Sequence, residues 1–157
     1  MNNLNGKINS KSQYILEVNN LKTYFTSGKK IIKAVDGIDF NLRYGEMLGI
    51  VGESGSGKSV TARSILRIIK KPGRIISGEI RFEETDIMKV PSYSMKKYRG
   101  KKMAMIFQEP LSALNPSFTI GWQIEESYKL HEKALSKRER EKKVVEMLAK
   151  VKIPDPE

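Results

Sequence analysis

The glycine-rich segment from Gly52 to Ser59 constrains this chain more than any other feature. It reads GESGSGKS and matches the pattern G-x-x-x-x-G-K-[ST] at every fixed position. A short apolar run, residues 47–51, comes directly before it, and three isoleucines between positions 60 and 70 follow at helical spacing. The sequence therefore predicts a buried strand, a tight glycine turn and a helix over 60–70, which is the local structure of loops that bind phosphate groups.

The residue types in this segment suit a polyphosphate ligand. Glycines let successive backbone N–H groups point inwards as an anion-binding nest, and the helix that follows adds its partial positive charge. Lys58 can reach the β- and γ-phosphates of a nucleotide, and Ser59 offers a hydroxyl to Mg²⁺, which prefers oxygen ligands. We expect Ser54, Gly55 and Ser56 to contribute mainly backbone amides. A glycine-serine linker that contains a lysine is the alternative, and the strand and helix on either side argue against it.

Charge and cysteine content exclude several other classes. The 157 residues include 29 Lys+Arg and 18 Asp+Glu, which gives a formal net charge of +11. Two lysine-rich segments, 96–102 and 137–143, carry much of it, but no aromatic platform or helix-turn-helix pattern accompanies them, so no nucleic-acid partner is expected. The absence of cysteine excludes disulfides, zinc-thiolate sites, iron–sulfur clusters and a thiol nucleophile.

The coarse pattern of the chain indicates an α/β fold. Residues 1–13 are polar, and we expect a disordered tail there. Apolar periodicity of 2 dominates the first part of the chain, whereas periodicity of 3.6 dominates the last part. The predicted strands are 14–25 and 31–42, joined by a turn at 27–30, then 78–82, and 102–107, which ends at Gln108. The predicted helices are a short one over 94–98 and longer ones around 120–128 and 144–151. Ser136 and Glu139 stand at capping-box spacing before the last helix.

Two stretches carry a resemblance to a known family. Residues 45–59 read GEMLGIVGESGSGKS, and residues 105–116 read MIFQEPLSALNP. The second run, in which FQ, an acid and Pro lead to LNP, is characteristic of one subfamily of ABC transporter ATP-binding subunits, those that drive oligopeptide and dipeptide importers. The chain resembles this subfamily from about Leu16 to its C-terminus. One mild departure is Glu109, where most relatives have Asp.

The resemblance implies a P-loop NTPase fold, an incomplete ABC-type nucleotide-binding domain with N-terminal antiparallel β-strands and the start of a helical subdomain. The expected boundaries follow the motifs. Residues 14–109 would form the ATP-binding core, and residues 110–157 would begin the helical subdomain, truncated before the signature motif.

The resemblance also implies roles for individual residues. Gln108 would be the Q-loop glutamine, which approaches Mg²⁺ and the γ-phosphate; Lys58 and Gln108 are the candidate catalytic residues, and Ser59 and Gln108 the candidate metal contacts. Phe25 falls where the family places an aromatic ring on adenine, Tyr24 is the neighbouring alternative, and an ordinary core role for Phe25 stays open. The candidate ATP-binding residues are Phe25, Gly52, Glu53, Ser54, Gly55, Ser56, Gly57, Lys58, Ser59 and Val60, of which 52–59 would be the Walker A motif.

Further consequences of the resemblance concern partners and activity. It implies ATP and Mg²⁺ as cofactors, transmembrane permease subunits, a second ATP-binding subunit that is identical or paralogous, and, indirectly, an extracellular solute-binding protein. The expected location is the cytoplasmic face of a prokaryotic cell membrane, as a peripheral subunit. Import of a solute, peptides by expectation, would be the function of the full-length ATPase.

The sequence lacks other motifs that such an ATPase uses. It contains no LSGGQ-like signature, no apolar strand ending in a paired Asp-Glu, and no switch histidine, since His131 lies in a polar helical stretch. We expect an N-terminal portion of an importer ATPase that binds nucleotide weakly and hydrolyses it negligibly by itself. The alternatives are another P-loop NTPase and a basic, non-enzymatic module that binds RNA or anionic membranes through Lys96–Lys102.

Overall fold

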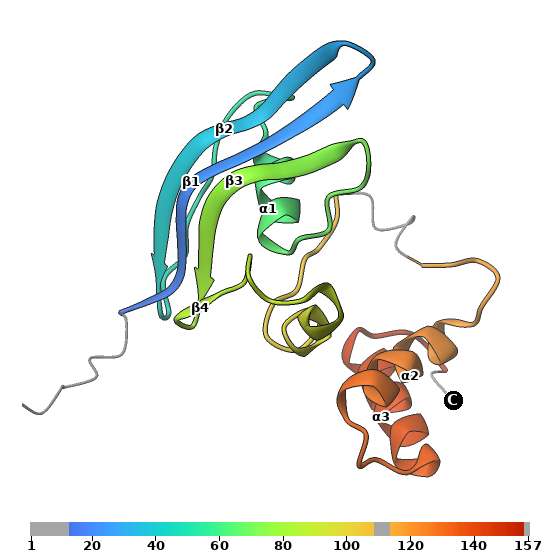
Figure 1. The fold of residues 1–157 in the computed structure, drawn as a ribbon. Helices are drawn as coiled ribbons and strands as arrows, with labels where there is room; N and C mark the ends of the chain where they lie inside the picture. The colour runs from blue at the N-terminus through green and yellow to red at the C-terminus, as the bar shows by residue number, and fades with distance from the viewer. Residues whose placement is uncertain (1–12, 109–113, 156–157) are drawn as a thin grey trace, which may run out of the picture. The chain divides into compact units, whose positions relative to one another are not determined.

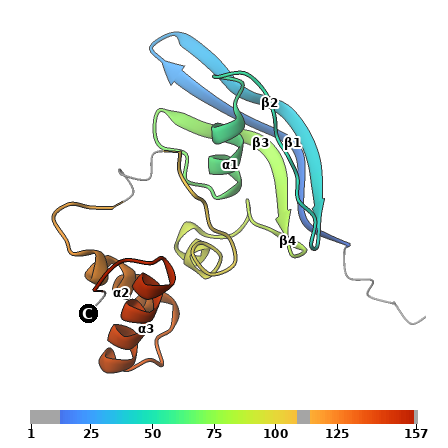
Figure 2. The same ribbon diagram turned by 180° about the vertical axis from the view of Figure 1, so that it is seen from behind.

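The computed structural model describes residues 13–108 and 114–155, and it divides into two compact units, one up to residue 95 and the other from residue 96 onwards. The first unit contains an antiparallel sheet with a helix against one of its faces (Figures 1 and 2). The second unit contains a pair of helices. The predicted tail, residues 1–13, lies outside the described residues except for Gln13, and the predicted boundary between residues 109 and 110 also falls outside them.

The sheet of the first unit has four strands in the order β2-β1-β3-β4, and every neighbouring pair is antiparallel. The first two strands form a long hairpin, which confirms the two N-terminal strands and the turn predicted between them. Alternation of buried and exposed side chains gives the sheet its core, in which Val18, Leu21 and Ile80 are fully buried. The strands are β1 (Tyr14–Ser27), β2 (Lys30–Arg43), β3 (Gly73–Phe82) and β4 (Thr85–Asp86).

The helix of the first unit, α1 (Lys58–Ile65), is shorter than the predicted 60–70. The chain leaves the helix at Arg67, whose φ of 53° is left-handed. The Arg67 guanidinium donates to the backbone oxygens of Ile87, at 2.7 Å, and Val90. A contact with a segment 20 residues further along the chain therefore accompanies the helix end, and local periodicity could not predict it.

The apolar segment before the glycine-rich loop does not form the predicted strand. Residues 46–53 take part in no ladder with the described strands, and Met47 and Val51 are 96% and 94% exposed. A strand that is buried on both faces needs neighbouring strands and covering helices, and β1 to β4 pair only with one another. The prediction of a buried strand here is therefore wrong for this structure.

The segment before Gln108 likewise forms no strand. Only an isolated bridge between Arg99 and Met103 is present in this part of the second unit, and Ile106 is 95% exposed. The short helix predicted just before it is a 3-10 helix, η1 (Ser92–Lys97), whose Met95 is fully buried.

The second unit packs α2 (Ile120–His131) against α3 (Lys137–Lys150). Thr119 caps α2 by accepting a hydrogen bond from the backbone N–H of Trp122 at 3.2 Å. Arg140 of α3 donates to Glu125 of α2 at 3.0 Å, an ion pair that is largely shielded from solvent. None of the described helices is long and apolar enough to cross a membrane.

Candidate phosphate-binding site

The glycine-rich loop ends at Gly57, where α1 begins. Gly57 is buried and has a left-handed φ of 92°. A Cβ atom at this position would lie 2.3 Å from the carbonyl oxygen of Ala34 in β2. Only glycine permits both this backbone conformation and this approach to the sheet, so β2 fixes the point from which the helix starts.

The rest of the loop is tightly folded and open to solvent. The Ser56 N–H donates to the carbonyl oxygen of Glu53 at 3.2 Å, which closes the turn. A Cβ atom on Gly52 would lie 2.6 Å from Ser56 Oγ, whereas one on Gly55 would meet nothing within 4 Å. The loop is therefore a solvent-exposed curve of backbone, here called the cradle, into which only the side chains of Ser56 and Lys58 are seen to reach among the contacts described.

Lys58 lies across this cradle. Its Nζ donates to the carbonyl oxygens of Gly52 at 2.6 Å and Glu53 at 2.7 Å, and to Ser56 Oγ at 3.2 Å. An ammonium group has three protons, so each has an acceptor within the loop itself. The lysine thus places one positive charge over the backbone groups that would surround a phosphate.

The first turn of α1 contributes donors as well. The first intrahelical bond runs from Thr61 N–H to Gly57 O at 2.8 Å, so the amides of residues 58–60 have no helical acceptor. Gly57 supplies no side-chain cap to them. Of these residues, Ser59 has an exposed side chain and Val60 a half-buried one. Together with Lys58, this turn can bind an anion.

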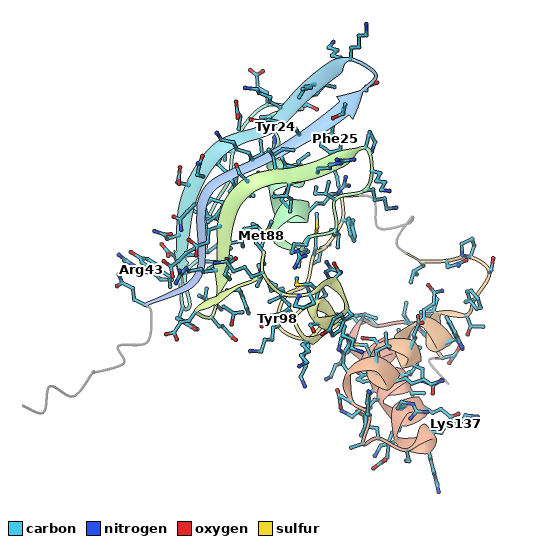
Figure 3. The ribbon with its side chains drawn as sticks, in the orientation of Figure 1. Tyr24, Phe25, Arg43, Met88, Tyr98 and Lys137 are labelled. Atoms are coloured by element: carbon cyan, nitrogen blue, oxygen red, sulfur yellow. The ribbon has the colours of Figure 1, made fainter. Side chains whose placement is uncertain are left out.

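The two candidate adenine-stacking residues lie side by side in β1 but differ in surroundings (Figure 3). The Phe25 ring packs tightly on Gly73, because a Cβ atom there would lie 2.6 Å from Phe25 Cε1. The same hypothetical atom would lie 2.7 Å from Ile69 Cγ2, so Phe25 also lies near the segment that follows α1. The ring is half-buried, which leaves part of it accessible.

Tyr24 is held on the other side of the sheet. Its hydroxyl donates to Asp36 Oδ1 at 2.5 Å, and this bond raises the pKa of Tyr24 and lowers the pKa of Asp36. Lys33 pairs with Asp36 at 3.3 Å and lies over the Tyr24 ring. The Val35 side chain faces Gly57, because its Cγ2 would lie 3.6 Å from a Cβ atom at that glycine. Successive side chains of a strand point to opposite faces, so Asp36 lies on the face away from Gly57. The surroundings of Tyr24 therefore favour Phe25 of the two.

Gln108 belongs to the second unit, where its side chain is exposed. Residues 109–113, which complete the FQEP run, lie outside the described residues. The structure thus brings together the candidates from Gly52 to Val60, and the roles of Gln108 stay predictions.

Sequence reasoning missed three residues that position the loop. Ala34 supplies the carbonyl that faces Gly57, and Thr23 and Ser64 form a buried contact between β1 and α1. Of these three residues, only Ser64 could have been found from the sequence, because Gly57, Thr61 and Ser64 recur at the spacing of one helical face. Ala34 and Thr23 carry no motif.

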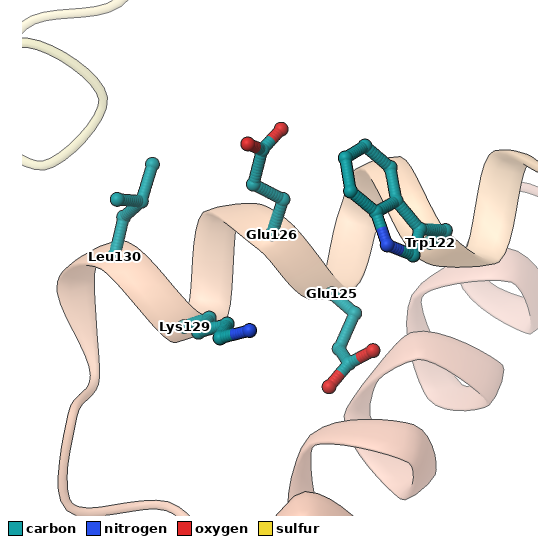
Figure 4. A pocket seen from close by; sticks show the side chains of 5 residues that line it. All are labelled: Trp122, Glu125, Glu126, Lys129 and Leu130. Carbon is teal, nitrogen blue, oxygen red and sulfur yellow. The ribbon is translucent and has the colours of Figure 1, made fainter. Parts of the chain in front are cut away.

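A second concave surface lies on α2 and has a volume of about 400 Å³ (Figure 4). Phe118 stacks on Trp122 at its edge, with 4.4 Å between ring centroids. The carboxylates of Glu125 and Glu126 point in different directions instead of converging (Figure 4). This surface is an exposed helix face, and we assign no ligand to it. Its lining residues are Trp122, Glu125, Glu126, Lys129 and Leu130.

Comparisons with known proteins agree with the geometry of the loop. Residues 35–157 match the model of the ABC transporter family. The chain is 44% identical over 143 residues to a dipeptide transport ATP-binding protein of Haemophilus influenzae, covering 91% of this chain and 43% of the relative. It is 46% identical over 138 residues to an oligopeptide transport ATP-binding protein of Bacillus subtilis, covering 87% and 42%. The chain thus spans less than half the length of these curated relatives.

Solved structures show the same likeness. A bacterial ABC transporter cassette solved as a dimer superposes with a TM-score of 0.75 and 26% identity, covering 89% of this chain and 58% of that chain. An ATP-binding cassette in a dimeric post-hydrolysis state, bound to ADP and Pi, matches with the same values.

Proposed function

This chain belongs to the ABC transporter family, and from that premise we propose that it supplies the phosphate-binding part of an ATPase that drives import of a solute, with peptides as the solute class. The observation that carries the proposal is the loop from Gly52 to Ser59, in which Lys58 lies over a backbone cradle at an uncapped helix start. The identity of 44–46% to dipeptide and oligopeptide transport ATP-binding proteins supports the solute class.

Each part of the site has a proposed task. The Lys58 ammonium and the amides of residues 53–60, apart from the Ser56 amide that donates to Glu53, bind the phosphates of ATP, which supplies the phosphoanhydride bond whose hydrolysis drives transport. The Ser59 hydroxyl, together with phosphate oxygens, holds Mg²⁺, and Gln108 contributes to the same ion and to catalysis. The exposed part of the Phe25 ring stacks on adenine.

The proposed assembly follows from the family. A second ATP-binding subunit is a proposed partner, and the dimers among the similar solved structures support it. Permease subunits would anchor the protein at the cytoplasmic face of a prokaryotic membrane, and an extracellular solute-binding protein would act through them.

Substitution of Lys58 tests the proposal. We expect Lys58→Ala to weaken ATP binding about ten- to hundredfold, because it removes charge-assisted hydrogen bonds to the phosphates. Lys101→Ala is the matched control, since it removes the same charge from an exposed residue outside the loop. Isothermal titration calorimetry with Mg²⁺-ATP measures both variants.

Two outcomes would contradict this assignment. If Lys58→Ala and Lys101→Ala bound ATP equally well, the loop would not be the nucleotide site. If RNA bound with a steep salt dependence that survived Lys58→Ala, the basic non-enzymatic alternative would be favoured instead.

We also expect the 157-residue chain to show no steady ATP turnover, because its sequence lacks the paired Asp-Glu and signature motifs.

A further inference from the structure

A pair of hydroxyl groups joins the phosphate-loop helix to the sheet. Thr23 of β1 and Ser64 of α1 are both fully buried, and their Oγ1 and Oγ atoms are 2.7 Å apart. The Ser64 hydroxyl also lies 2.7 Å from the backbone oxygen of Val60, to which it donates. Because Ser64 has only one proton, the Thr23 hydroxyl is the donor in the first contact.

The residues that α1 buries most deeply are polar. The buried residues of α1 are Thr61 and Ser64, and no apolar side chain within α1 is buried. Apolar burial has no preferred direction, whereas a buried hydrogen bond holds its donor and acceptor to a narrow range of distance and angle. Two buried, hydrogen-bonded hydroxyl groups therefore set where α1 lies along β1.

The two ends of this chain of hydrogen bonds lie next to the two parts of the candidate site. Val60, the last acceptor, follows Lys58 and Ser59 in the first turn of α1. Thr23, the first donor, stands two residues before Phe25 in β1. A shift between β1 and α1 would move the Phe25 ring relative to the phosphate cradle.

We propose that Thr23 and Ser64 are positioning residues that hold the phosphate loop at the distance from Phe25 that a nucleotide spans. The inference rests on the proposed function and deepens it. A nucleotide that contacts both ends of the site loses affinity when their spacing is no longer fixed. A bare polyphosphate contacts only the loop, so its affinity does not depend on this spacing.

The test compares two ligands on the same variants. Thr23→Val keeps the shape of the side chain and removes the hydroxyl, and we expect it to weaken ATP binding about fivefold, in the range of one buried hydrogen bond. Inorganic tripolyphosphate should bind to Thr23→Val within twofold of wild type. Thr23→Ser restores a donor and should restore the affinity for ATP. Calorimetry gives the dissociation constants, and urea unfolding shows that each variant is folded.

A second variant allows the same binding measurement if Thr23→Val does not fold. In Thr23→Val the Ser64 hydroxyl keeps its bond to Val60 but loses the donor from which it accepts. The double variant Thr23→Val, Ser64→Ala removes both hydroxyl groups, so it leaves no such buried acceptor and should fold even if Thr23→Val does not. Equal weakening of ATP and tripolyphosphate, or no weakening of either, in the folded variants would overturn the inference. If the wild-type chain bound neither ligand, or Lys58→Ala bound both normally, the proposed function itself would fail.

Discussion

Two glycines of the phosphate loop share a left-handed backbone but differ in their neighbours. Gly55 has a φ of 84° and open space where a side chain would go. Gly57 has a φ of 92° and the Ala34 carbonyl oxygen 2.3 Å from the position of a Cβ atom. The same residue type is thus required at Gly55 by conformation, and at Gly57 by conformation and by contact with β2.

We expect Gly57→Ala to destabilise the first unit more than Gly55→Ala does. Gly55→Ala adds only the left-handed strain of about 1–2 kcal/mol, whereas Gly57→Ala must also push α1 away from β2. Urea unfolding monitored in the sheet measures both losses. Equal destabilisation of the two variants would show that the Ala34 contact does not constrain the loop.

The helices show how far local signals determine an element. The capping box of α3, expected from Ser136 and Glu139, is confirmed: the Ser136 N–H donates to Glu139 Oε2 at 2.7 Å and the Glu139 N–H to Ser136 Oγ at 3.4 Å. The end of α1 combines local and distant contacts: the Ile68 N–H donates to Arg63 O and the Arg67 N–H to Ser64 O, both at 2.9 Å, while the Arg67 side chain donates to Ile87 and Val90. The start of α3 shows in its residue types, whereas the end of α1 does not, because its left-handed position is occupied by Arg67 and not by the usual glycine.

The capping box predicts a response of α3 to acid. Hydrogen bonds from the Ser136 hydroxyl and backbone N–H hold the pKa of Glu139 below its ordinary value. Since the folded-state pKa is the lower one, this stabilisation is present above about pH 4.3, the unfolded value, and is lost as pH falls through the folded pKa. Glu139→Gln should remove this acid dependence, as amide exchange of α3 between pH 3 and pH 6 would show.

Two further variants make that experiment decisive. Ser136→Ala should cost α3 about 1 kcal/mol at neutral pH, because it removes the N-cap acceptor. Glu126→Gln is the control, since it removes an exposed carboxylate of α2 and should leave the acid response of α3 intact. An unchanged acid response in Glu139→Gln would contradict the assignment of the response to the capping box.

At the scale of the whole molecule, each unit exposes an apolar segment that the sequence predicts to be a strand. Met47 is 96% exposed in the first unit, and Ile106 is 95% exposed in the second. Large exposed apolar side chains that are adjacent in sequence bind apolar dyes and promote association.

We expect Met47→Lys and Ile106→Lys each to lower the fluorescence of an apolar dye such as anilinonaphthalene sulfonate. Ser92→Lys is the matched control, because it adds the same charge at an exposed polar residue and removes no apolar area. Dye titration at equal protein concentration makes the comparison. Equal fluorescence of all four proteins, wild type included, would show that these segments are covered in solution.

Sequence alone determined those features of this protein that depend on a few adjacent residues. The loop from Gly52 to Ser59, the hairpin of β1 and β2 and the α3 cap follow from motif, alternation and capping chemistry. Only the tertiary structure decided what depends on residues far apart: the absence of a ladder at 46–53, the carbonyl that faces Gly57, and the Thr23–Ser64 bond across 41 positions of sequence. The physical reason is that a hydrophobic pattern states which side chains avoid water, whereas pairing partners and buried hydrogen bonds are set by where the chain returns in space.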